Sequence, residues 1–293
     1  MFHDSPPKIL PLADARANDP RRIVDLRAEY RESFERDLAK PDWTTVILSA
    51  ESLSVSPRPA IARLVDWVRR HVGTLQVVAF VRHPVDWVRS VIQERLKMGY
   101  TLEQLYAQLP APRWQNRLTP WIDAVGIDNF KVVSFESAIS GAGIVPSFCD
   151  AAALPYEEIR GALTLEGAQT NTSMSLEAAL LISSLNRQRP LLVDGRVSQE
   201  RSWRGTDCLM AVPGRPFRLV SADAVRAREL SRGDVEWLNG ICGTDYYQDV
   251  FDDTPLAEDL QESPVPNETI DALARMISDL GNAVVGGLGR NRG

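Results

Sequence analysis

The segment that decides the fold runs from Leu75 to Met98 and reads LQVVAFVRHPVDWVRSVIQERLKM. Its apolar run Val77–Val81 is rich in β-branched residues and predicts a short strand buried on both faces, as in a parallel sheet. Pro84 is favourable as the first residue of a helix, and it excludes the residue before it from the α region. Apolar residues then recur every four positions, at Val88, Ile92 and Leu96. The segment therefore predicts a strand, a sharp turn and a helix.

The turn carries a candidate ligand-binding residue, Arg82. It directly follows the predicted strand, and so we expect it at the carboxyl edge of the sheet, beside the N-terminus of the next helix. Ligands of open α/β folds bind at that edge, and helix N-termini attract anions. Ser90 lies on the same helix, away from the apolar stripe. The pattern favours an anion site, and the alternative is an ordinary strand–helix unit with a surface arginine.

The composition is that of a globular protein and excludes several classes. Of the 293 residues, 44% are hydrophobic and 25% are charged, and the net charge of −6 provides no basic field for nucleic acid. The three cysteines lie far apart, which favours free thiols over a zinc site or disulfides. No apolar run approaches the ~20 residues of a membrane-spanning helix, and the N-terminus does not resemble a signal peptide. We therefore expect a cytoplasmic protein.

Strands alternate with helices in the first half of the chain, which predicts a parallel sheet with right-handed crossovers. The three predicted strands are Thr44–Leu48, Val77–Val81 and Phe130–Phe135. We expect one domain over residues 1–293, in which helices dominate beyond residue 150. Its expected parts are a loose lead-in (1–19), an α/β core (20–150), a mainly helical part (151–280) and a flexible tail (281–293).

The opening segment resembles the 3′-phosphate-binding motif of sulfotransferases that use 3′-phosphoadenosine 5′-phosphosulfate (PAPS). That family shows a buried strand, then Arg-x-Pro, and a Ser eight residues after the Arg on the following helix. Arg82, Pro84 and Ser90 are the counterparts here. Further pieces agree in order over residues 43–190: Ser49-Ala50-Glu51, Trp121, Gly126, Phe135-Glu136 and Asn171-Thr172-Ser173-Met174-Ser175.

The resemblance implies a fold, a reaction and roles for particular residues. The implied fold is a three-layer parallel sheet of the sulfotransferase, P-loop-like type, with a mainly helical C-terminal part. The implied reaction transfers a sulfuryl group from PAPS to a hydroxyl of a carbohydrate or small-molecule acceptor. Arg82 and Ser90 would hold the 3′-phosphate, and Glu51 would be the general base. A solvated Glu51 that caps the next helix is the open alternative.

The sequence departs from the family at the N-terminus. There, the family has a strand and a loop like Pro-Lys-x-Gly-Thr-Thr, which cradles the 5′-phosphosulfate. Here Pro7-Lys8 is followed by Ile9-Leu10-Pro11. Either the sequence begins after that loop, or the protein has lost half of its cofactor site. Arg196, Arg201 and Arg204 belong to a polar stretch, Asp194–Gly205, which is either a replacement for the lysine or a solvated loop.

A second hypothesis comes from another functional class. A non-catalytic relative of the sulfotransferase fold would bind a nucleotide or a partner protein without transferring a group. His83 lies beside Arg82 and could be catalytic, but its place before a proline explains it well enough and is the favoured interpretation. His, Cys and acidic residues form no metal-ligand spacing, so the sequence implies no metal, and a metal-dependent glycosyltransferase ranks below both hypotheses.

Overall fold

In the computed structural model of the chain, the described residues are 20–40, 43–162, 173–193, 196–198, 203–251 and 266–290. They are mostly helical and contain a small two-stranded parallel sheet, which is compatible with the expected α/β class. The chain divides into two compact units that interleave in sequence. Unit 1 is drawn from residues 1–80, 113–133 and 143–154, and unit 2 from residues 81–112, 134–142 and 155–293.

The helices of unit 1 follow the apolar periodicity of their sequences. They are α1 (Pro20–Leu38), α2 (Arg58–Arg69), α5 (Trp114–Val125) and α7 (Ile144–Ala151), with short 3₁₀ helices η2 (Glu51–Val55) and η3 (Ile127–Asn129). Trp67 on α2 is buried, stacks on Phe34 of α1 with ring centroids 5.3 Å apart, and donates from Nε1 to Glu35. The core of this unit therefore forms around aromatic contacts between helices.

The two strands of the parallel sheet are β1 (Val77–Val81) and β2 (Phe130–Ser134). The expected position of β1 is confirmed, but its expected burial on both faces is wrong. Residues 77–80 are only half-buried, and on β2 the side chain of Lys131 is exposed. The reason is that a pair of strands offers few faces for covering helices, whereas a strand inside a wider parallel sheet is covered on both. Phe135 was expected in this strand but begins a helix instead.

The strand predicted at Thr44–Leu48 is wrong. These residues adopt no regular structure and pair with no strand among the described residues. Val46, Ile47 and Leu48 are 37%, 54% and 44% exposed. An apolar β-branched run becomes a strand only when a neighbour supplies its hydrogen bonds and covers its side chains. The described residues therefore show neither the third strand nor the expected three-layer sheet.

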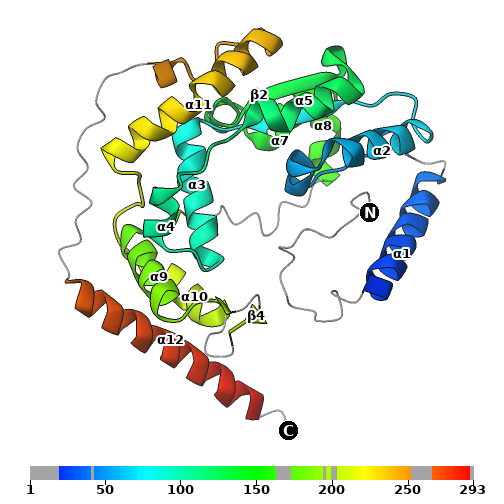
Figure 1. Ribbon diagram of the computed structural model, residues 1–293. Coiled ribbons are helices and arrows are strands. Elements are labelled where there is room, and N and C mark those ends of the chain that lie inside the picture. Colours follow the sequence, from blue (N-terminus) through cyan, green and yellow to red (C-terminus); the bar gives the residue numbers. More distant parts are fainter. Residues whose placement is uncertain are drawn as a thin grey trace. The chain divides into compact units, whose positions relative to one another are not determined.

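Unit 2 contains the other described elements. They are α3 (Pro84–Lys97), α4 (Leu102–Ala107), α6 (Phe135–Ser140), α8 (Tyr156–Ile159), η4 (Arg160–Ala162), α9 (Leu176–Gln188), the hairpin β3 (Leu192–Val193) with β4 (Arg196–Val197), α10 (Trp203–Met210), α11 (Ser221–Cys242), η5 (Gln248–Phe251) and α12 (Asn267–Arg290). Val88, Ile92 and Leu96 are fully buried in its core, which confirms the stripe predicted on α3. Helices α9, α10 and α12 pack side by side in this unit (Figure 1).

Two further expectations for this part of the chain are wrong, and others cannot be compared. The tail expected at 281–293 is helical as far as Arg290, because α12 continues through its glycines. The polar stretch Asp194–Gly205 includes β4 and the start of α10. The lead-in at 1–19 and the residues Asn171 and Thr172 lie outside the described residues.

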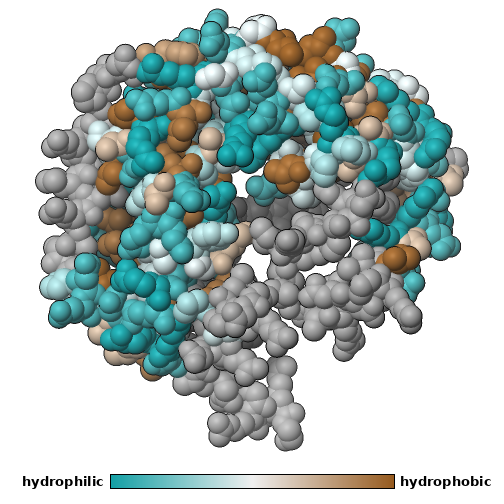
Figure 2. All heavy atoms as spheres, viewed as in Figure 1, coloured by the Kyte–Doolittle hydropathy of each residue, from teal (hydrophilic) through white to brown (hydrophobic). Residues whose placement is uncertain are grey.

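The surface of the described residues is mixed in character. Figure 2 shows a largely hydrophilic face on which hydrophobic residues form several separate patches. None of the described helices combines the length and the apolar character needed to cross a membrane. All three cysteines are free thiols.

Candidate functional site

The turn between β1 and α3 has the strand–turn–helix geometry predicted from the sequence. β1 ends at Val81, His83 is the N-cap with an extended ψ of 129°, and Pro84 begins α3. The His83 carbonyl accepts a hydrogen bond from the backbone N–H of Trp87 at 2.8 Å. Arg82 therefore lies between the carboxyl end of a strand and the N-terminus of a helix, as the sequence predicted.

The Arg82 side chain is held by an aromatic ring and a carboxylate, without a hydrogen bond from its Nε to the described residues. Its guanidinium carbon lies 5.1 Å from the centre of the Phe135 ring, and its Nε lies 3.9 Å from Oε1 of Glu136. Nε is buried and has no hydrogen-bond partner among the described residues, whereas the side chain as a whole is 32% exposed. A cation–π contact and a loose ion pair thus orient the arginine, and they leave its Nε without a hydrogen bond to the described residues.

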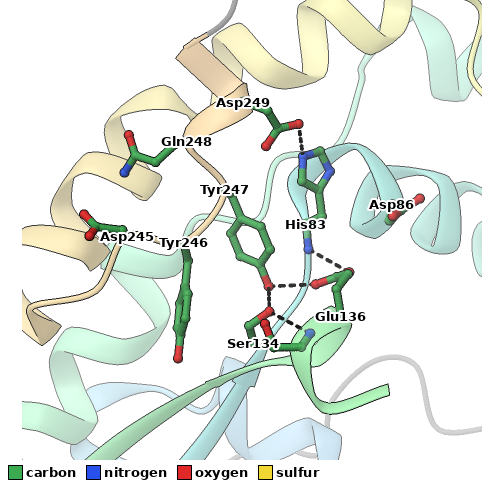
Figure 3. Close-up of a pocket in the computed structure, with 10 residues that line it drawn as sticks. His83, Asp86, Ser134, Glu136, Asp245, Tyr246, Tyr247, Gln248 and Asp249 are labelled. Carbon is green, nitrogen blue, oxygen red and sulfur yellow. Dashed lines mark hydrogen bonds and ion pairs between the residues drawn. The ribbon is translucent and has the colours of Figure 1, made fainter. Parts of the chain in front are cut away.

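Glu136 connects the turn to β2 and to the C-terminal part of the chain. Its Oε1 accepts a hydrogen bond from the backbone N–H of His83 at 3.0 Å, and its Oε2 lies 2.8 Å from the hydroxyl of Tyr247 (Figure 3). That hydroxyl also lies 2.8 Å from the carbonyl oxygen of Val81 and 3.2 Å from Oγ of Ser134. Because the hydroxyl has one proton, the carboxylate, as the strongest of these acceptors, is its favoured partner.

Tyr247 reaches this network in a strained conformation. Its φ of +57° is rare for a residue with a side chain and costs about 1–3 kcal/mol. Burial, with a further contribution from the charge of Glu136, raises the pKa of the phenol above its ordinary value of 10.0. The phenol is therefore protonated at neutral pH and acts as a hydrogen-bond donor.

His83 has a carboxylate partner on the other side of the turn. Its Nε2 lies 2.9 Å from Oδ2 of Asp249, and its ring meets the Tyr247 ring edge to face with centroids 5.4 Å apart. Figure 3 shows the second ring nitrogen on the side of the ring that faces Asp86. An imidazole oriented by a carboxylate suits proton transfer. Sequence reasoning missed this pair, since 166 positions separate its members.

A pocket of about 520 Å³ opens beside these residues, within unit 2. All the residues that line it carry a polar group in the side chain: His83, Asp86, Ser134, Glu136, Ser137, Asp245, Tyr246, Tyr247, Gln248 and Asp249. Arg82 does not line it. Two of its carboxylates face arginines, since Asp86 lies 2.9 Å from Arg89 and Asp249 lies 3.7 Å from Arg228. Such a lining suits a neutral or cationic hydrogen-bonding ligand better than an anion.

The predicted site residues fall into different parts of the chain. Arg82 and Ser90 both belong to unit 2, and Ser90 is partly buried on α3. Glu51 belongs to unit 1, where it is exposed and begins η2 rather than following a strand. The structure thus removes the expected reason for its position, and its role as a base stays a prediction.

Arg196, Arg201 and Arg204, the candidates to replace the lysine of the family's N-terminal loop, are described only in part. The backbones of Arg196 and Arg204 belong to β4 and α10, whereas Arg201 and the side chains of the other two lie outside the described residues. Within the described part of the chain, no group of three or more His, Cys, Asp or Glu side chains is arranged to hold a metal ion. Comparison of the chain with protein-family models, curated proteins and solved structures found no match.

Proposed function

We propose that the β1–α3 turn binds the 3′-phosphate of PAPS and that the protein is a sulfotransferase, acting on a hydroxyl of a carbohydrate or small-molecule acceptor. The observation that carries this proposal is Arg82, a partly exposed arginine whose buried Nε has no hydrogen-bond partner among the described residues. It lies at the carboxyl end of a strand and beside a helix N-terminus. Both surroundings favour a bound anion.

The energetics of Arg82 support a phosphate ligand. An unsatisfied buried donor costs about 1–3 kcal/mol, which a phosphate oxygen would recover on binding. A guanidinium presents several donors in a plane and matches phosphate oxygens well. Ser90 would add a hydroxyl from α3, the helix that follows Arg82. We also propose that the chain is related in fold to the three-layer parallel sheet of the sulfotransferases.

The proposed reaction joins two substrates. An acceptor oxygen attacks the sulfur, the bond from sulfur to the 5′-phosphate oxygen breaks, and adenosine 3′,5′-bisphosphate leaves. A base takes the proton of the acceptor hydroxyl, and Glu51 is the residue that the family resemblance suggests. Positioning and charge stabilisation supply most of the rate in transfers of this kind. The polar pocket beside the turn is the site that we propose for the acceptor.

Calorimetry with two nucleotides tests the phosphate site. The wild type should bind adenosine 3′,5′-bisphosphate more tightly than adenosine 5′-monophosphate, and Arg82→Ala should lose this preference with a fall in affinity of about 10- to 100-fold. Ser90→Ala should show a smaller fall. Arg95→Ala, in the last turn of the same helix, is the matched control and should bind like the wild type. Equal affinity of the wild type and Arg82→Ala for the bisphosphate would overturn the proposal.

The alternative function is non-catalytic: the protein would bind the same nucleotide but would not transfer a sulfuryl group. Its supporting observation is that the proposed base Glu51 is exposed and begins η2 instead of following a strand, so that the position expected of a base is not seen. Incubation with ³⁵S-labelled PAPS and a panel of hydroxyl acceptors separates the two functions. Labelled product that depends on Arg82 supports the enzyme. Tight binding of the bisphosphate without product from any acceptor supports the alternative.

A further inference from the structure

We infer that Tyr247 is a positioning residue, whose hydroxyl holds the Glu136 carboxylate away from Arg82 and so leaves the guanidinium for an anion. This inference rests on the proposed phosphate site at Arg82. It concerns a residue outside the sequence motif and gives it a specific task. Tyr247 does not touch the ligand in this scheme but acts through Glu136.

The distances around Glu136 show a carboxylate that stops short of a salt bridge. Its Oε1 lies 3.9 Å from Nε of Arg82, whereas charge-assisted hydrogen bonds between such groups measure about 2.7–2.9 Å. Its two oxygens are instead held by the N–H of His83 at 3.0 Å and by the hydroxyl of Tyr247 at 2.8 Å. A movement of the carboxylate by about 1 Å would therefore close a strong bond to the arginine.

Glu136 is a competitor for any anion at Arg82. A carboxylate and a phosphate use the same donors of a guanidinium, so a closed salt bridge would block the ligand. The Tyr247 hydroxyl gives the carboxylate another donor. A phenol is protonated at neutral pH, and burial with the charge of Glu136 raises the pKa of Tyr247 further, so the donor also persists in mildly alkaline solution.

The segment that carries Tyr247 is built to hold this position. The side chain of Asn239, near the end of α11, donates to the carbonyl of Tyr246 at 2.9 Å and accepts from its N–H at 3.0 Å. The contact between His83 and Asp249 fastens the same segment two residues further on. The left-handed conformation of Tyr247 is maintained by these contacts, and strain of this kind is concentrated at functional positions.

A double-mutant experiment with adenosine 3′,5′-bisphosphate as the probe tests the inference. Tyr247→Phe keeps the ring and removes the donor, and we expect the affinity to fall by about tenfold because Glu136 then closes on Arg82. In the double variant Tyr247→Phe/Glu136→Gln the competing charge is gone, so the affinity should return to the wild-type value within about threefold. Tyr100→Phe, which alters an exposed tyrosine of the same unit outside the pocket, is the control and should leave the affinity unchanged.

The outcomes separate this inference from the proposed function. If Arg82→Ala weakens binding but Tyr247→Phe does not, the positioning role is wrong and the phosphate site stands. If the double variant binds as weakly as Tyr247→Phe, the tyrosine has only a structural role, which also overturns the inference. If Arg82→Ala binds like the wild type, the proposed function fails, and this inference fails with it.

A second measurement covers the case in which Tyr247→Phe does not fold, as judged by circular dichroism and thermal melting. Glu136→Gln in the wild-type background removes the competing charge and keeps one oxygen as the acceptor for the His83 N–H. Its amide NH2 then faces the Tyr247 hydroxyl, which can accept from it and donate to the Val81 carbonyl instead. An affinity equal to or above that of the wild type supports the inference. A lower affinity shows that the carboxylate itself is needed by the site, and it overturns the inference.

Discussion

Arg82 owes its position to its sequence neighbours and its chemical surroundings to distant residues. Val81 ends β1 before it and Pro84 begins α3 after it, which fixes the arginine at the turn. Phe135 and Glu136, which orient its guanidinium, follow β2 more than 50 positions later. At the scale of single residues, the local motif therefore places the Arg82 guanidinium at the turn, and the tertiary structure determines which groups contact it.

Tyr106 on α4 should contribute to a fall in the free energy of unfolding at high pH. Burial, with a further contribution from Asp223, raises the pKa of its phenol from 10.0 to about 12. Between these values the unfolded chain loses a proton that the folded chain keeps, so the free energy of unfolding falls as pH rises. Tyr106→Phe should reduce this fall by up to about 1 kcal/mol per pH unit.

Urea unfolding at pH 8, 10 and 11 measures this effect. Tyr100→Phe removes a tyrosine that is 47% exposed in the same unit, and it controls for the loss of one titratable phenol. If Tyr106→Phe loses stability above pH 10 as steeply as the wild type and this control, Tyr106 does not contribute to the alkaline dependence.

At the scale of elements, the start of α9 shows how a cap joins two segments. The Ser175 hydroxyl accepts a hydrogen bond from the N–H of Ala178 at 2.9 Å and donates one to the carbonyl of Val212 at 2.7 Å. The N–H of Leu176 donates to the carbonyl of Arg215 at 2.7 Å. One side chain thus satisfies a free donor of the helix and ties the helix to a segment that precedes α11.

Ser175→Ala should therefore lower the free energy of unfolding by about 1–3 kcal/mol, because it removes the cap and leaves the Val212 carbonyl without this donor. Urea denaturation at neutral pH measures the change. Ser140→Ala is the control, since that exposed serine only donates to carbonyls of its own helix, and its effect should stay within about 0.5 kcal/mol. Equal effects of the two substitutions would show that the cap contributes nothing beyond an ordinary surface serine.

At the scale of the whole molecule, each unit has buried residues of its own. The largest apolar cluster belongs entirely to unit 2 and includes the fully buried Phe217, whereas Ile61, Val65 and Trp67 are buried in unit 1. If residues 1–293 form one domain, as the sequence predicts, the whole chain should unfold together. If the two compact units are independent, each should unfold separately. A core substitution in one unit distinguishes them.

Phe217→Ala should lower the free energy of unfolding of unit 2 by about 3–5 kcal/mol, since it removes a fully buried aromatic ring. Hydrogen–deuterium exchange should then rise in peptides from α3, α9 and α11 and stay near wild type in peptides from α2 and α5. Ile61→Ala is the matched variant for unit 1 and should give the opposite pattern. A uniform rise in both variants would show that the two units unfold as one domain.

The sequence alone determined the elements whose signals are local. An apolar run, a proline and a four-residue repeat placed β1, the turn at Arg82 and α3, because chain geometry and side-chain periodicity act within a few residues. The segment 44–48 carried the same strand signal and was wrong, because pairing depends on a neighbour that local sequence does not specify.

The surroundings of Arg82 and the pairing of His83 depend on contacts between segments that are far apart in the sequence. The contacts from His83 to Glu136 and to Asp249 span 53 and 166 positions, and the contact from Tyr247 to Glu136 spans 111. No sequence spacing predicts such contacts, since they depend on where several helices place their ends. The sequence determined which residue would carry the positive charge. The carboxylate of Glu136 near this charge, and the hydroxyl of Tyr247 that restrains the carboxylate, come from distant parts of the chain. Their positions depend on tertiary structure, because hydrogen bonds of about 3 Å form only after distant segments have packed.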